Sequence, residues 1–426
     1  MYTFYSIVLI ILAALLSPVI LVAFLVQPKF RAGFLKKLGF YPNSVILSEH
    51  GERKNLILFH TVSVGEVNAL EALIKRTKQE FPDSKIAVTT VTKTGQEVAN
   101  NKLKDTADII TYFPYDIKFC INSLLNTLNP QIIIIAETEI WPCFCHEVKK
   151  RNIPLLLVNG RISPTSYKGY KKAKFFFRHV LNNFSSILMQ TQSDMDRIVD
   201  IGAPQEKTEV MGNLKFDITN KLNDEQVTEL RNSLKTEGKR ILIAGSTHKG
   251  EDEIIIETYR RLKQDFQELK LLIAPRHPER NEQVYRLLAS TGLNIGKRSN
   301  NNIFKDSDII LLDTMGELGK LYSVADIAFL GGSFSGTGGH NPLEAAIYGI
   351  PVISGETVFN FKDIYRFMTD SPAAKLVKNK DELYEYIKEL LSDTEVYEAA
   401  SKACFEIFEK NRGALDYAIE KIKYYI

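Results

Sequence analysis

The chain lacks several residue patterns that would assign it to a class at once. Its 426 residues include four cysteines and one tryptophan, and the cysteines do not show the paired CxxC spacing of structural zinc sites. Long basic runs are also missing, and the net charge is only +3, so we exclude nucleic acid as a partner. Hydrophobic residues at 45% and charged residues at 25% are ordinary globular values, which argues against both a disordered chain and a multi-span membrane protein.

Charged residues are absent from residues 4–26, and this apolar run is long enough to cross a membrane. At about 1.5 Å per residue it spans roughly 34 Å, more than the hydrocarbon layer of about 30 Å. The basic residues that follow are Lys29, Arg31, Lys36 and Lys37. This bias leaves the rest of the chain in the cytoplasm. We therefore predict a membrane anchor over residues 1–27; the alternatives are a buried core helix and a secretory signal, which the missing N-terminal Lys or Arg disfavours.

Short apolar runs recur from residue 55 onward, separated by segments with helical patterns. They occupy residues 56–59, 86–89, 132–135, 155–158, 241–244, 271–274, 309–312, 327–330 and 351–353. Apolar strands that alternate with helices predict parallel sheets covered on both faces, and hence an α/β fold. The length suits two domains. We predict an N-terminal domain over 28–213, a C-terminal domain over 214–400, a polar connection over 212–237, and a C-terminal helix over 401–426 that can pack back on the first domain.

A glycine-rich loop follows the apolar run 327–330. Five glycines occur among residues 331–339, and Asn341 and Pro342 then suit the N-cap and the first position of a helix. Backbone N–H groups and the positive helix end would favour an anion there, and Glu344 could accept hydrogen bonds from sugar hydroxyls. The spacing is not GxGxxG, which disfavours a dinucleotide site. The alternative is a purely structural turn.

Other polar loops follow the remaining predicted strands, and in open parallel sheets ligands bind beyond the carboxyl ends of strands. In the second half these loops contain Ser246, His248 and Arg276. Together with His340 in the glycine-rich loop, they suit a nucleotide phosphate and its sugar. Each residue taken alone also fits a helix cap or a salt bridge.

Two loops in the first half carry candidate acids. Glu66 follows the run 56–59 and would enter the first turn of a helix, either as a cap stabilised by the helix dipole or as a catalytic base. Glu137 and Glu139 follow the run 132–135, beside the single tryptophan, Trp141. Acids two residues apart point to opposite sides of an extended chain, so we expect only Glu137 to face a cleft. The alternative is a capped helix start with Trp141 in the core.

Basic and aromatic residues interleave over residues 167–178. Such a segment can lie against anionic lipid head groups. It can equally form helices that pack their aromatic residues inward.

Seven segments resemble the motifs of 3-deoxy-D-manno-oct-2-ulosonic acid (Kdo) transferases. They are HTVSVGE at 60–66, ETEIWP at 137–142, GNLKFD at 212–217, AGSTHKGEDE at 244–253, PRHPER at 275–280, MGEL at 315–318 and GGHNPLEAA at 338–346. The resemblance implies a GT-B glycosyltransferase, with two Rossmann-like domains facing a central cleft after an N-terminal transmembrane helix. It further implies transfer of Kdo from CMP-Kdo to a lipid A precursor, lipid IVA, with inversion, on the cytoplasmic side of the inner membrane during lipopolysaccharide core biosynthesis.

The resemblance also carries roles onto single residues. Glu66 matches the family's general base, and Glu137 and Lys215 match positions assigned to transition-state stabilisation. The CMP-binding segments match Pro275, Arg276, Met315, Gly316, Glu317, Asn341, Pro342, Leu343 and Glu344. No cofactor or metal is implied, since no DxD motif follows a strand. The chain departs from many relatives at Cys143, where they have Asn, and at Gly160, where they have Ala.

Two other interpretations remain open because fold does not determine chemistry. A UDP-sugar transferase or a UDP-GlcNAc 2-epimerase uses the same two domains, and binding of UDP rather than CMP would reveal it. A membrane-tethered binding protein without catalysis would bind phosphorylated glycolipid but release no CMP.

Overall fold

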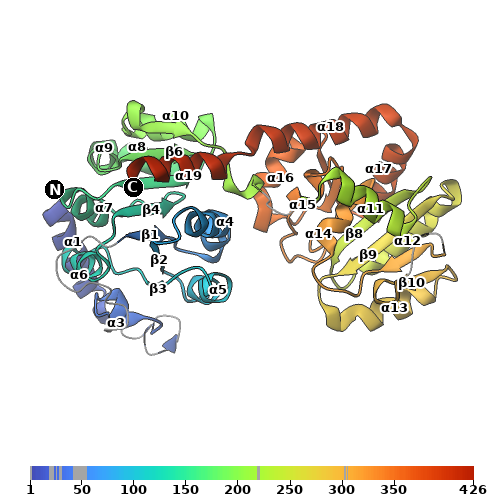
Figure 1. Ribbon diagram of the computed structural model, residues 1–426, viewed down its shortest axis with the longest axis horizontal. Coiled ribbons are helices and arrows are strands. Elements are labelled where there is room, and N and C mark those ends of the chain that lie inside the picture. Colours follow the sequence, from blue (N-terminus) through green and yellow to red (C-terminus); the bar gives the residue numbers. More distant parts are fainter. Residues whose placement is uncertain are drawn as a thin grey trace. The chain divides into compact units, whose positions relative to one another are not determined.

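The computed structural model describes residues 2–18, 24, 26–27, 31–41, 55–217, 221–301, 304 and 306–426. The chain divides into two compact units (Figure 1). The N-terminal unit contains Met1–Asp217 together with Arg412–Ile426, and the C-terminal unit contains Ile218–Asn411. Each unit is a parallel sheet with helices on its faces, so the prediction of an α/β fold is confirmed in both.

The N-terminal sheet has the described strand order β3-β2-β1-β4-β5-β6-β7, all parallel. Its strands are β1 (Leu56–His60), β2 (Lys85–Thr90), β3 (Ile109–Tyr112), β4 (Ile132–Ala136), β5 (Leu155–Gly160), β6 (Ser186–Met189) and β7 (Thr208–Val210). Its helices are α1 (Tyr2–Leu15), α3 (Phe34–Lys37), α4 (Val64–Glu80), α5 (Lys93–Leu103), α6 (Lys118–Leu128), α7 (Pro142–Lys150), α8 (Pro164–Lys172), α9 (Lys174–Leu181), α10 (Gln192–Ile201), α19 (Ala414–Tyr425) and the 3-10 turns η3 (Gln205–Lys207) and η4 (Leu214–Phe216).

Alternate residues of the central strands enter separate cores on the two faces of this sheet. Ile133 and Ile135 belong to one cluster, whereas Ile132 and Ile134 belong to the other. This follows from the two-residue repeat of a strand, and it explains why the apolar runs are continuous rather than alternating.

The C-terminal sheet has the described order β10-β11-β9-β8-β12-β13-β14, again all parallel. Its strands are β8 (Arg240–Thr247), β9 (Leu269–Pro275), β10 (Ile295–Lys297), β11 (Ile309–Leu311), β12 (Ile327–Leu330), β13 (Val352–Gly355) and β14 (Ala374–Val377). Its helices are α11 (Asp224–Leu234), α12 (Glu251–Asp265), α13 (Asn281–Ala289), α14 (Leu318–Leu321), α15 (Leu343–Ala346), α16 (Lys362–Thr369), α17 (Lys380–Ser392) and α18 (Thr394–Asn411), with 3-10 turns η5 (Pro278–Arg280), η6 (Arg298–Asn300), η7 (Tyr322–Val324) and η8 (Phe359–Phe361).

Each sheet contains a reversal point, at which the connections from neighbouring strands leave in opposite directions. In the N-terminal unit β1 lies between β2 and β4, and in the C-terminal unit β8 lies between β9 and β12. At such a point neighbouring strands send their following loops in opposite directions, which opens a crevice beyond their carboxyl ends. Ligands are therefore expected to bind at the loops after β1, β4, β8 and β12.

The stretch expected to connect the domains, residues 212–237, is largely built into them. Asn213, Leu214 and Phe216 are buried in the N-terminal unit, and α11 occupies Asp224–Leu234 in the C-terminal unit. The sequence alone could not distinguish this segment from a linker because its buried residues are few and widely spaced.

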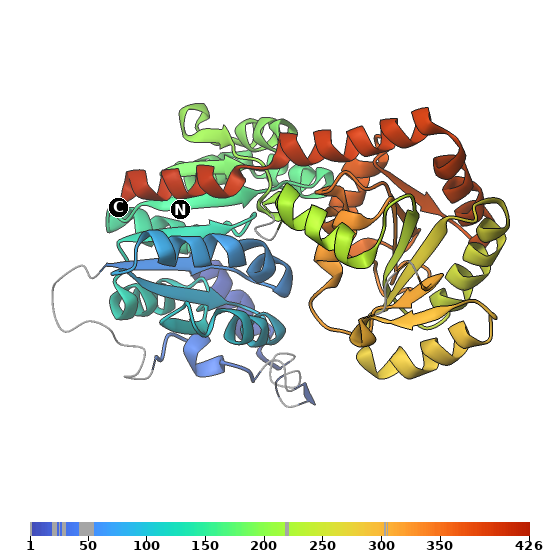
Figure 2. The same cartoon turned by 45° about the vertical axis from the view of Figure 1, so that its right-hand side comes forward.

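The C-terminal helix α19 returns to the N-terminal unit and lies along it in both views (Figures 1 and 2). The carboxylate of Asp217 accepts hydrogen bonds from the N–H groups of Gly413 and Leu415, each at 2.7 Å. These bonds satisfy N–H groups at the start of α19 that the helix itself leaves unpaired. The preceding helix α18 stays in the C-terminal unit and runs through residue 400, where we had expected a boundary.

The N-terminal helix α1 lies against the N-terminal unit. The Tyr2 ring stacks on His146 with centroids 4.0 Å apart, and its hydroxyl donates to the His179 carbonyl at 3.1 Å. Among the helices that the structure describes, none combines the length and apolarity needed to cross a membrane. Residues 19–23 and 25 of the expected span lie outside the described residues.

Residues 167–178 fall on α8 and α9. Tyr170, Phe176 and Phe177 pack against the N-terminal core, while Phe175 is 79% exposed. This fits the alternative in which most of the aromatic residues face inward.

Candidate active site

Glu66 lies in the first turn of α4, directly after β1. Its carboxylate accepts hydrogen bonds from the Val62 N–H at 2.7 Å and from the Ser63 hydroxyl at 3.1 Å. The residue is 6% exposed. The pKa of Glu66 is raised to about 7, mainly by burial and further by the negative charges of Glu139 and Glu137. The hydrogen bonds from Val62 and Ser63 partly oppose this rise. Glu66 therefore makes the contacts of a helix cap and also has the pKa of a base.

Glu137 and Glu139 follow β4, the neighbour of β1 at the reversal point. Burial raises the pKa of Glu139 to about 7, and the Glu137 charge contributes. Both carboxylates thus contribute to the raised pKa of Glu66. Residues 137–138 form a turn, with Glu137 at φ +50°, so the alternation of an extended chain, from which we expected only Glu137 to face a cleft, does not apply here. A non-glycine residue in this left-handed region stores strain of the kind found at functional sites.

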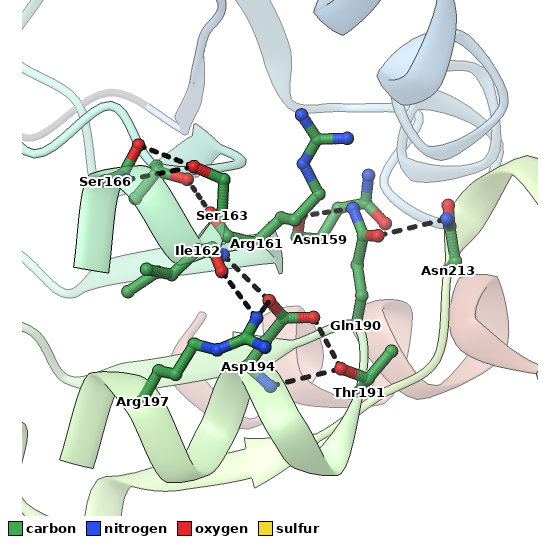
Figure 3. A network of polar contacts seen from close by, with 11 residues as sticks. Asn159, Arg161, Ile162, Ser163, Ser166, Gln190, Thr191, Asp194, Arg197 and Asn213 are labelled. Carbon is green, nitrogen blue, oxygen red and sulfur yellow. Dashed lines mark hydrogen bonds and ion pairs between the residues drawn. The ribbon is translucent and has the colours of Figure 1, made fainter. Parts of the chain in front are cut away.

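Lys215 lies on η4, and a buried amide network holds its backbone (Figure 3). Asn159 is the penultimate residue of β5, at φ +55°, and accepts the Leu214 N–H at 3.1 Å through Oδ1. The Gln190 side chain donates to the Asn159 carbonyl at 3.0 Å and accepts from the Asn213 amide at 3.1 Å. Asn213 in turn accepts the Lys215 N–H at 3.0 Å. The sequence predicts no role for these three amides, although Asn159 directly follows the apolar run 155–158 and Asn213 lies in the motif at 212–217.

A second part of the same network fixes the loop after β5. The Asp194 carboxylate accepts the Ile162 N–H at 2.9 Å, and Arg197 donates to the Ile162 carbonyl at 2.8 Å. In Figure 3 the Arg161 side chain points away from this pair. The loop is therefore anchored at Ile162 while the neighbouring arginine projects from it.

The two departures from the family pattern are both accommodated. Cys143 is buried, and its N–H donates to Asp116 at 3.0 Å at the start of α7. A Cβ at Gly160 would lie 2.5 Å from the Met189 sulfur, so glycine at this position goes with methionine on the neighbouring strand. The four cysteines are buried free thiols.

In the C-terminal unit, Glu251 organises the glycine-rich loop. It is the first residue of α12 and is 1% exposed. Its Oε2 accepts hydrogen bonds from the N–H groups of Gly332 and His248, each at 2.8 Å. Its Oε1 accepts from Ser333 at 2.9 Å and Phe334 at 2.8 Å. An internal carboxylate therefore occupies these loop N–H groups, so they are not available to an external anion.

Histidines and an arginine gather around this loop. The Nε2 atoms of His248 and His340 are 3.1 Å apart, and the His277 ring lies 5.4 Å from that of His248 between centroids. Arg276 follows β9, and its N–H donates to the Thr247 carbonyl at 3.0 Å. Ser246 forms a bulge in β8 at φ +55°, and its carbonyl would meet a Cβ at Gly331 at 2.4 Å, which explains the glycine there. The strand-end residues Ser246, His248, Arg276 and His340 therefore lie in one region.

The helix after the glycine-rich loop is short. α15 begins at Leu343, after Pro342, and has four residues, so its dipole is too small to attract an anion strongly. Pro342, which we had expected at the first helical position, is the N-cap, and Asn341, the expected N-cap, lies one residue earlier and accepts the Leu343 N–H at 3.2 Å. Burial raises the pKa of Glu344, and the positive charge of Arg276 opposes only part of this rise. Within the described part of the chain its carboxylate accepts no hydrogen bond, so it can accept hydrogen bonds from the hydroxyl groups of a ligand.

The segment 315–317 precedes α14. Met315 is 74% exposed, and Gly316 has φ +82°, a conformation that glycine adopts without strain. Glu317 accepts a hydrogen bond from Arg298 at 3.2 Å. Glu317 also lines a hollow of about 340 Å³ with residues of α11, Gln226 among them. Pro275, which is also predicted to bind CMP, is the final residue of β9.

Comparison with known proteins agrees with the sequence motifs. The family model described as 3-deoxy-D-manno-octulosonic-acid transferase (kdotransferase) matches residues 32–218. A Haemophilus influenzae 3-deoxy-D-manno-octulosonic acid transferase is 36% identical over 405 residues, covering 94% of this chain and 93% of that protein. A Rickettsia felis protein of the same name is 33% identical over 374 residues, covering 87% and 79%. UDP-GlcNAc 2-epimerase from Neisseria meningitidis shares the fold alone, with a TM-score of 0.53 and 16% identity over 87% of this chain and 100% of that one.

Proposed function

The chain belongs to the family of Kdo transferases, and we propose that it transfers Kdo from CMP-Kdo to lipid IVA with inversion at the anomeric carbon. As a Kdo transferase it is a glycosyltransferase of lipopolysaccharide biosynthesis. The observation that carries the finer proposal is the Glu66 carboxylate, which is held by two hydrogen bonds and has a pKa of about 7.

Glu66 is the general base of the proposed step. The acceptor hydroxyl attacks the anomeric carbon of Kdo, Glu66 takes the hydroxyl proton, and the bond to the CMP phosphate breaks on the opposite face. A base whose pKa lies near the working pH is the most effective, and such proton transfer is worth about 10²–10⁴-fold in rate. Glu137 and Glu139 support this role because their negative charges raise the pKa of Glu66.

The C-terminal unit binds the donor. CMP leaves with increased negative charge on its phosphate, which the cationic Arg276 and the N–H groups of His248 and His340 stabilise. Glu344 accepts hydrogen bonds from the ribose hydroxyls, and Met315 offers an exposed apolar surface to the nucleoside. The proposal requires the two reversal points to face each other across a cleft, as the GT-B arrangement does, with Lys215 at the junction stabilising the transition state.

Membrane association is part of the proposal because lipid IVA is itself a lipid. α1 leaves a row of apolar side chains exposed, Ile7, Ile10, Ile11 and Leu15 among them, and basic residues follow at Lys36 and Lys37. We place the protein at the cell inner membrane as a single-pass protein with both units in the cytoplasm. A variant lacking residues 1–27 should keep activity on detergent-dispersed acceptor and lose membrane association; its complete recovery with membranes would show that other surfaces anchor it.

The direct test is incubation of the protein with CMP-Kdo and lipid IVA, followed by mass spectrometry of the lipid and measurement of released CMP. Lipid gaining whole Kdo units with matching CMP release supports the proposal and counts the units added. Glu66→Gln should abolish this gain while CMP still binds, and Glu71→Gln, the same substitution further along α4, should not. Intact CMP-Kdo, or thermal protection by UDP but not by CMP, would contradict the assigned donor.

A further inference from the structure

His248 and His340 face each other from separate loops. Their Nε2 atoms are 3.1 Å apart and their rings are nearly parallel, at 20°. In a neutral imidazole one nitrogen is a donor and the other an acceptor. The two facing nitrogens can therefore share only one hydrogen, and while they do so neither Nε2 atom offers an N–H group to a ligand.

One carboxylate holds both histidines in place. Glu251 Oε2 accepts the His248 N–H and the Gly332 N–H, each at 2.8 Å. A Cβ at Gly332 would come within 3.2 Å of His340 Nε2, so the His340 ring packs directly over this glycine. The close approach of the two rings is thus fixed by buried backbone contacts on both sides.

The surroundings of the pair are positive. The charged or titratable groups that act on it are Glu251, Arg276, His277 and Arg280. Glu251 is engaged by four backbone N–H groups, and Arg280 pairs with the buried Asp252. Arg276 and His277 remain to act on the pair.

These surroundings keep the pair neutral in the free protein. Burial lowers the pKa of His340 to about 4, and the positive charges of His248, Arg276 and His277 contribute. Burial also lowers the pKa of His248, against the Glu251 charge. An anion placed between the rings would reverse this balance, because an opposite charge nearby favours the protonated imidazole.

We propose that the His248–His340 pair binds the phosphate of the leaving CMP and takes up one proton from solvent as it does so. This inference rests on the proposed function, since it takes CMP as the leaving group. Before binding, one Nε2–H donates to the other Nε2. On binding, the accepting Nε2 gains a proton, the bond between the rings opens, and both Nε2–H groups donate to phosphate oxygens.

The uptake suits the reaction because CMP leaves as a phosphate monoester whose second pKa is about 6, so its charge rises as the bond to Kdo breaks. A positive charge that appears with that negative charge stabilises the transition state more than the ground state. The pair would therefore assist departure of the nucleotide as well as hold it.

Calorimetric titration of the full-length protein with CMP, in buffers of different ionisation enthalpy at one pH, measures the protons taken up. At about pH 8, where CMP is a dianion, the wild type should take up about one proton per CMP bound, and affinity should fall about tenfold per pH unit while uptake persists. His340→Gln and His248→Gln should still bind CMP, more weakly, with uptake near zero. His277→Gln is the matched control and should keep the uptake.

Three outcomes are distinguishable. Uptake that disappears in both pair variants and persists in the His277 variant supports the inference. CMP binding by the wild type without uptake, or uptake retained in the pair variants, overturns it and leaves the Kdo transferase proposal intact. Failure of the wild type to bind CMP overturns the proposed donor and the inference with it. Circular dichroism of each variant confirms that loss of uptake does not come from loss of the fold.

Discussion

Replacing Glu66 with glutamine should stabilise the N-terminal unit at neutral and alkaline pH while it removes transfer. The pKa of Glu66 is raised from 4.5 to about 7 on folding, so the folded state disfavours the ionised form. At about 1.4 kcal/mol per pKa unit, keeping Glu66 ionised costs roughly 3 kcal/mol. Glutamine avoids that cost and can still accept the Val62 N–H through its amide oxygen.

The sign of the effect depends on pH in a defined way. Near pH 4.5 the wild-type carboxyl is largely protonated in the folded protein, so the substitution should change stability little. Between pH 4.5 and 7 the wild type progressively loses stability that the variant keeps, and above about pH 7 the difference is constant. For a unit of this size roughly 3 kcal/mol corresponds to an increase in Tm of about 6–12 °C.

Thermal unfolding of both proteins at several values between pH 5 and 8.5 provides the assay. Glu71→Gln is the matched control on the same helix: burial acts against ionisation there too, but Lys102 and Lys75 lower the pKa of Glu71 overall, so its removal should destabilise the protein as pH rises. If Glu66→Gln were no more stable than the wild type at pH 8.5, the carboxylate would not lie in a setting that disfavours its charge, and the case for a tuned base would fail.

Three further predictions concern the groups around the site. Glu139→Gln should move the rising limb of the kcat/KM profile to lower pH, because the Glu139 charge helps to raise the pKa of Glu66; an unmoved limb would show that the two do not interact. Glu251→Ala leaves four backbone N–H groups without their acceptor, at about 1–3 kcal/mol for each one that stays buried, and should weaken CMP binding at least tenfold by calorimetry, with Glu251→Gln intermediate. Asn213→Ala removes the acceptor of the Lys215 N–H and should lower kcat about tenfold or more with little change in KM; a change in KM alone would assign the network to binding.

The strands that the sequence predicts and those it misses differ in position within the sheets. All nine apolar runs are strands, and they include the central β1, β4, β8 and β12. The missed strands are β3, β6, β7, β10 and β14, and four of these lie at sheet edges. An edge strand is covered less completely, so its sequence needs fewer apolar residues: Lys375 in β14 is exposed and Glu209 in β7 is partly so. A continuous apolar run is a signal of central position.

The sequence predicts which strand ends carry the candidate site residues, but it does not predict the hydrogen bonds among them. Glu66 and Glu137 follow strands of the N-terminal sheet, and His248 and the glycine-rich loop follow strands of the C-terminal sheet. Within each sheet, parallel topology brings such strand-end positions to one edge. The role of Glu251 was not predictable, because its hydrogen-bond partner Gly332 is 81 residues away in sequence. An acid in the first turn of a helix is ordinarily interpreted as a surface cap. Only the fold shows that the loop after β12 covers Glu251.

The helix α19 has a consequence for how the protein is made. Its buried residues Ala414, Leu415, Ala418, Ile419 and Ile422 complete one core of the N-terminal unit, yet the ribosome delivers them only after the whole C-terminal unit, which is contiguous from Ile218 to Asn411. Domains usually fold in the order in which they are synthesised. The N-terminal unit is synthesised first, but it cannot complete this core until α19 has been synthesised, after the whole C-terminal unit. Until then the apolar residues that α19 covers stay exposed.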